Sequence, residues 1–115
     1  MPYDEELAHR IRAALAGCDA VTERAMFGGL AFMVAGNMAV GVSRDGGLIV
    51  RLDPDEGERL VARPHVSPFP GAARPMRGWL RIDGEGVATG RALDAWIGRS
   101  VAFVASLPPK RRRRR

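Results

Sequence analysis

The chain has 115 residues, of which 46% are hydrophobic and 27% charged, a mixture typical of one globular domain. Its formal net charge of +5 comes from the last six residues, because residues 1–109 hold twelve arginines against thirteen acidic residues. We therefore predict a nearly neutral folded domain over 1–109 and a disordered basic tail over 110–115, and any electrostatic attraction to a polyanion must come from that tail.

The first predicted element is a helix over about residues 4–16. Leu7, Ile11 and Leu15 recur at helical spacing and form one apolar stripe. Asp4 is placed to cap the start of this helix, and Gly17 to end it.

A stretch of nineteen residues without a charge follows, over 25–43. Its length approaches the roughly 20 residues of a membrane helix, but it holds several glycines, each of which costs a helix up to about 1 kcal/mol relative to Ala. A phosphate-binding loop is rejected as well, because Val42 stands where the motif needs lysine. The stretch instead predicts a hairpin, with strands over 26–34 and 38–43.

A third strand is predicted over 48–52, after the turn signal at Asp45 and Gly46. Alternation places Ile49 and Arg51 on one of its faces. On the opposite face we expect Leu48, Val50 and Leu52. A short helix then starts at the capping sequence "DPDE", residues 53–56.

The proline-rich run over 64–75 favours an irregular or edge segment. A strand follows, with Leu80 and Ile82 on one face and Trp79, Arg81 and Asp83 on the other. Thr89 can cap a last helix. Its predicted apolar stripe consists of Leu93, Trp96, Ile97, Ser100, Val104 and Leu107. The order is helix, three-stranded antiparallel meander, short helix, one or two further strands and C-terminal helix, which predicts an α+β domain.

Few residues indicate catalysis. His9 lies near Glu5 and Glu6, but a catalytic or metal site would need further ligands and only His65, in the proline-rich run, remains, so both histidines are interpreted as solvated surface residues. Cys18, the one cysteine, excludes an internal disulfide and follows the C-terminal end of a helix, where the dipole disfavours a thiolate. We predict no enzyme, no metal and no cofactor. The single cysteine and the polar, acidic N-terminus suggest a cytoplasmic protein without membrane association.

The basic tail is the clearest binding signal, because guanidinium groups pair with phosphates. The predicted nucleic-acid contacts in it are Lys110, Arg111, Arg112, Arg113, Arg114 and Arg115. Arg77 and Arg81, on either side of Trp79, could add contacts. Two other interpretations stay open: a tail that serves only solubility, and a solvated strand face in which Trp79 packs.

Self-association is a third hypothesis. Phe27, Ala31 and Met33 would share the face of the first hairpin opposite Leu30, Phe32 and Val34, and one of the two faces could lack a covering helix. A homodimer would then form through that face.

Four segments in order, "RAMFGGLAFMVAGNMAVGV", "LIVRLDPDE", "RPMRGWLRID" and "FVASLPPK", resemble the TfoX N-terminal-domain family, named for the Sxy-type competence regulators of bacteria. The resemblance runs from about Tyr3 to Lys110. Its most specific positions, interpreted as packing and backbone-geometry positions, are Met26, Phe27, Gly28, Gly29, Met76, Arg77, Gly78 and Trp79.

The resemblance implies an α+β fold of the secretion-chaperone-like type and supplies no catalytic residue. In the competence regulators this domain precedes a C-terminal domain, and the two together assist a cyclic-AMP receptor protein. We therefore expect a stand-alone, non-enzymatic regulatory or protein-interaction domain with an unidentified protein partner. Nucleic-acid binding through the arginine tail is the alternative.

Overall fold

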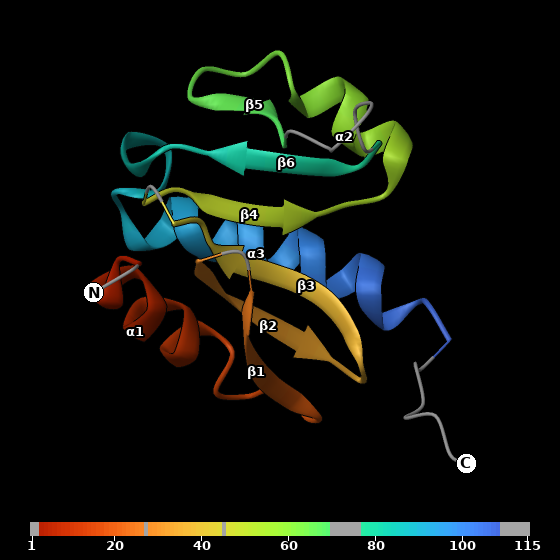
Figure 1. The fold of residues 1–115 in the computed structure, drawn as a ribbon. Coiled ribbons are helices and arrows are strands. Elements are labelled where there is room, and N and C mark those ends of the chain that lie inside the picture. The colour runs from red at the N-terminus through yellow and green to blue at the C-terminus, as the bar shows by residue number, and fades with distance from the viewer. Residues whose placement is uncertain (1–2, 27, 45, 70–76, 109–115) are drawn as a thin grey trace.

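The computed structural model describes residues 3–26, 28–44, 46–69 and 77–108. These residues form an α+β domain (Figure 1). Its helices are α1 (Glu5–Ala14), α2 (Pro54–Leu60) and α3 (Gly90–Ala105), with a short 3-10 helix η1 (Gly84–Val87). Its strands are β1 (Val21–Met26), β2 (Gly29–Val34), β3 (Asn37–Val42), β4 (Leu48–Arg51), β5 (Val66–Pro68) and β6 (Trp79–Ile82). The α+β class predicted from the sequence is confirmed.

The strands form one antiparallel sheet in the order β1-β2-β3-β4-β6-β5. The first four follow one another as a meander, and β6 then lies between β4 and β5. Figure 1 shows α3 running behind the sheet, and α1 contacts both α3 and β3. The two longer helices thus share one face of the sheet.

The hydrophobic core lies between that face and these helices. Phe32, Val40 and Val50 from the sheet are fully buried and pack in one cluster with Ile11 of α1 and Leu93 of α3. The predicted stripe on the last helix is confirmed, since its members from Leu93 to Val104 are buried, while Leu107 is half-buried.

The helix starts follow the predicted caps. The Asp4 carboxylate accepts a hydrogen bond from the Leu7 amide at 3.1 Å, and the Thr89 hydroxyl oxygen accepts one from the Ala92 amide at 3.1 Å. Asp53 caps α2 in the same way. Each side chain satisfies an amide that has no partner within its own helix.

The predicted strand over 26–34 is wrong in one respect: it is divided into the end of β1 and the whole of β2. Gly28 lies between them with φ at +79°, and the backbone carbonyl of Val42 occupies the place of a side chain at Gly29. The meander consequently has four strands and not three. β1 escaped prediction because most of its residues are exposed, so that they show no buried face.

The charge-free stretch therefore lies in strands, as the hairpin interpretation requires. Ala35 and Gly36 both have positive φ, which is the geometry of the tight turn that joins β2 to β3. Within the described ranges, none of the helices has the length and apolar character needed to cross a membrane.

Candidate binding groove

The sheet face opposite α1 and α3 has no helix over its centre among the described elements (Figure 1). Strand alternation directs Ala31 and Met33 of β2, Ile49 of β4 and Trp79 of β6 to this side. The side chains between them in each strand enter the core. We call this side the open face.

A groove of about 570 Å³ lies on the open face, within the 300–1,000 Å³ range of ligand sites. Most of its surface is apolar. Its described lining consists of Arg24, Met26, Gly29, Leu30, Ala31, Met33, Gly36, Asn37, Met38, Val42, Ser43, Arg44, Ile49, Arg51, Phe69 and Trp79.

Two small residues lie next to each other at the centre of the sheet. Ala31 of β2 pairs with Gly41 of β3, which in turn pairs with Ile49 of β4. A side chain at Gly41 would collide with the Leu30 carbonyl, at 2.9 Å from an added Cβ, and with the Met38 methyl at 3.1 Å. The Met38 side chain therefore occupies the space that the missing side chain of Gly41 leaves.

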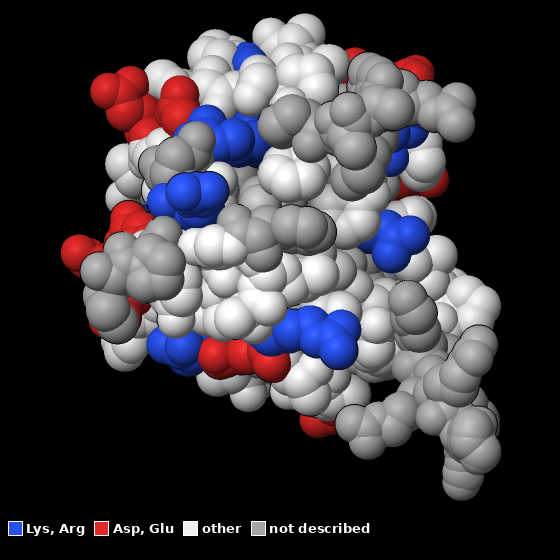
Figure 2. Space-filling model, in the orientation of Figure 1, with Lys and Arg blue, Asp and Glu red and all other residues white. Residues whose placement is uncertain are grey.

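Three arginines line this groove: Arg24 on β1, Arg44 after β3 and Arg51 on β4. Figure 2 shows basic side chains at several points around the pale centre of this face. Within the described part of the chain, Arg24 and Arg44 are exposed and form no ion pair. The described lining contains no acidic residue, so the groove favours anionic groups.

Arg51 is held in place by two aromatic rings. Its guanidinium carbon lies 5.4 Å from the centre of the Trp79 ring and 5.8 Å from that of Phe103. Arg51 and Trp79 are direct partners across β4 and β6. Cation–π contacts of this kind fix the cation without neutralising it, so Arg51 keeps its charge for a ligand.

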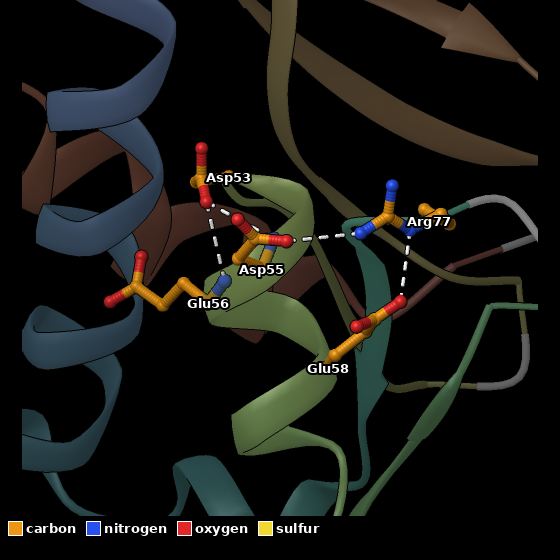
Figure 3. A network of polar contacts seen from close by, with 5 residues as sticks. All are labelled: Asp53, Asp55, Glu56, Glu58 and Arg77. Atoms are coloured by element: carbon orange, nitrogen blue, oxygen red, sulfur yellow. Dashed lines mark hydrogen bonds and ion pairs between the residues drawn. The ribbon is translucent and has the colours of Figure 1, made fainter.

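The two arginines predicted beside Trp79 have different surroundings. Arg77 turns toward α2, where its guanidinium lies 3.1 Å from an Asp55 carboxylate oxygen and 2.9 Å from one of Glu58 (Figure 3). The hydrogen bond that Arg77 donates to Glu58 raises the pKa of Arg77. Arg81 lies on β6, with its guanidinium against Gly47. The predicted tail contacts at 110–115 lie outside the described residues.

The described positions that carried the family resemblance lie at strand ends. Met26 and Trp79 line the groove. Gly78 has φ at +85°, and the Leu52 carbonyl fills the space of a side chain there. Phe27 and Met76 lie outside the described residues.

The two histidines lie away from the groove. His9 is exposed on α1. His65 Nδ1 lies 3.0 Å from an Asp83 carboxylate oxygen. Partial burial raises the pKa of Asp83, but the hydrogen bonds from His65 and Gly86 outweigh it, so that the net shift is downward. Among the described residues, no group of three or more His, Cys, Asp or Glu side chains is placed to hold a metal ion.

Sequence reasoning missed the arginines of the groove. Arg24 lies in the unpredicted strand β1, and Arg44 in a turn, so neither had an assigned face. Alternation placed Arg51 on the same face of its strand as Ile49, but its neighbour Trp79 lies far along the chain. Alternation indicates which residues of each strand share a face. These residues form a surface only once the order of the strands in the sheet is known.

One comparison with known proteins identifies the chain. The model of the TfoX N-terminal domain family matches residues 13–104. Comparisons with curated proteins and with solved structures found no significant match. The family match covers most of the sequence: it includes every described strand and all but the last residue of α3, but only the last two residues of α1. The chain belongs to the TfoX N-terminal domain family.

Proposed function

We propose that this chain is a non-enzymatic regulatory domain that binds another protein through the groove on its open face. The observation that carries the proposal is the combination of an apolar floor with arginines that have no acidic partner in the described structure. The methionine and aromatic side chains of the lining are half-buried. Partly exposed apolar side chains gathered in one groove are typical of an interaction site, and arginine is enriched in protein interfaces.

The chemistry of the lining supports binding over catalysis. General acid–base catalysis requires a group that exchanges a proton near neutral pH, such as His, Asp or Glu. The described residues of the groove include none of these and no cysteine. Its charged groups are guanidiniums, which stay protonated and act by attracting and orienting anions.

Nucleic-acid binding through the tail remains the alternative prediction. It depends on residues 110–115, and of the additional contacts predicted for it, Arg77 is engaged by two carboxylates. A chain that ends at Pro109 tests it by titration with DNA and RNA at two salt concentrations. Loss of affinity on removal of the tail would support this alternative, and equal affinity would exclude the tail.

Photo-crosslinking tests the protein-binding function. Met33, half-buried in the groove, is replaced by a benzophenone amino acid, and Ala102, exposed on α3, receives the same group as a matched control. After irradiation in extract of the source cells, we expect a defined protein adduct from position 33 that position 102 does not give. Identical adducts from both positions, or none from position 33, would contradict the proposal.

A further inference from the structure

The charge of the groove limits what can occupy it. Arg24, Arg44 and Arg51 supply three positive charges, and the described lining supplies no negative charge. Guanidinium groups form their strongest pairs with carboxylates and phosphates. A matching ligand therefore carries several anionic groups, spaced widely enough to reach arginines on β1, on β4 and after β3.

The floor of the groove requires apolar groups between those anions. Met33 and Met38 are half-buried and present thioether surface in the groove, whereas Ala31 and Ile49 are buried. Methionine adapts its shape to different apolar partners. Leucine- or phenylalanine-sized side chains fit such a floor, whereas a wholly polar ligand would leave it unused.

We infer that the groove holds an extended peptide segment that carries both acidic and apolar residues and crosses the open face. The inference rests on the proposed function, because it names the chemistry of the partner at the same surface. The apolar side chains contact the methionines of the groove, and the carboxylates pair with its arginines.

Other occupants fit less well. Single-stranded nucleic acid binds by stacking bases on aromatic rings, but the Trp79 ring already carries the Arg51 guanidinium. Residues 1–109 also have a net charge of −1, unlike a nucleic-acid surface. The chain's own tail at 110–115 has the same sign as the arginines of the groove, which would repel it.

A labelled peptide tests the inference. The probe is a fluorescein-labelled peptide of about nine residues composed of Glu, Leu and Phe, titrated with the full chain and followed by fluorescence anisotropy. The matched peptide has Lys in place of Glu, and a single-stranded oligonucleotide serves as competitor. We expect saturable binding of the acidic peptide that weakens as the salt concentration rises. The affinity for the basic peptide should be lower by about tenfold or more.

Variants connect the binding to the groove. The double variant Arg24→Glu/Arg44→Glu reverses two exposed charges and should weaken acidic-peptide binding about tenfold or more. Arg91→Glu, an equally exposed change on α3, should leave it unchanged. Circular dichroism checks that both variants are folded.

Three outcomes would overturn the inference: equal affinity for both peptides, equal effects of both variants, or displacement of the acidic peptide by the oligonucleotide. A concentration-dependent dimer that Met33→Glu dissociates would assign the groove to a second copy of the chain, and would overturn it as well. The proposed function would survive a failed peptide titration if crosslinking at position 33 still yields a specific protein.

Discussion

The two faces of the sheet are built from alternating residues of the same strands, yet they differ in almost every property. The covered face is a continuous apolar layer that packs against α1 and α3, with Phe32 and Val40 fully buried. The open face has a groove lined by methionines, two aromatic residues and three arginines. The comparison teaches that the covered face stabilises the fold, while the open face differs from it in the charge and the exposure of its side chains.

Neighbouring residues of β2 provide the largest contrast. Phe32→Ala should lower the free energy of unfolding by about 3–5 kcal/mol, because it leaves a cavity in the core. Met33→Ala, on the open face, should cost about 1 kcal/mol or less. Denaturant unfolding measures both. Equal losses would show that the open face is packed as tightly as the core and would remove the distinction.

Replacing each of two glycines by alanine should change the free energy of unfolding in opposite directions. Gly78→Ala should destabilise the chain by more than about 1 kcal/mol, because φ is positive and the Leu52 carbonyl occupies the added methyl's position. Gly98→Ala, exposed in the middle of α3 with nothing within 4 Å, should stabilise it by up to about 1 kcal/mol. Thermal unfolding of both variants checks the signs, and a stabilising Gly78→Ala would contradict the close approach of β6 to the end of β4.

The buried hydroxyl of the covered face should have a smaller effect. Ser100 donates a hydrogen bond of 2.7 Å to the Ala39 carbonyl and ties α3 to β3. Ser100→Ala should cost about 1 kcal/mol in unfolding free energy. Ser106→Ala, whose exposed hydroxyl bonds to Phe103 within its own turn, is the control and should change little. Similar losses in both would mean that the bond to β3 adds no stability.

The smallest effect belongs to the ion pair that joins α1 to β1. The hydrogen bond from Arg12 lowers the pKa of Glu23 below its ordinary value of 4.5. Because that pKa is lower in the folded chain, the pair's contribution is present above about pH 4.5 and is lost as the pH falls through the lowered value.

Glu23→Gln tests this direction. Its stability should decline less than that of the unchanged chain between about pH 5 and pH 3, measured by denaturant unfolding at each pH. Asp94→Asn, on the exposed side of α3, controls for removal of a carboxylate. If the stability of Glu23→Gln declines as steeply as that of the unchanged chain, the pKa of Glu23 does not differ between the folded and the unfolded chain.

Much of the covered face could be predicted from the sequence, because burial produces periodicity. Leu93 to Val104 repeat at helical spacing, and Leu48, Val50 and Leu52 alternate, so that these elements showed their inner faces directly. β1 could not be found in this way, since exposure on both sides leaves no alternation.

The open face required information that lies outside local patterns. Trp79 reaches Arg51 because β6 pairs with β4, and the predicted order of elements does not specify this pairing. Arg24 lies on β1, a strand that no sequence pattern predicted. The sequence therefore shows the residues themselves, but the surface that they form depends on how the strands pair.

The most direct test of the open face as the binding surface uses the methyl groups of methionine and alanine. Met26, Met33 and Met38 line the groove, whereas Ala8 and Ala39 are buried on the covered side. The full chain, labelled at these methyls, is titrated with the acidic peptide and observed by NMR. The account predicts that the three methionine signals shift with a common saturation curve while the two alanine signals stay in place. Saturable binding that leaves the methionine signals unchanged would contradict it.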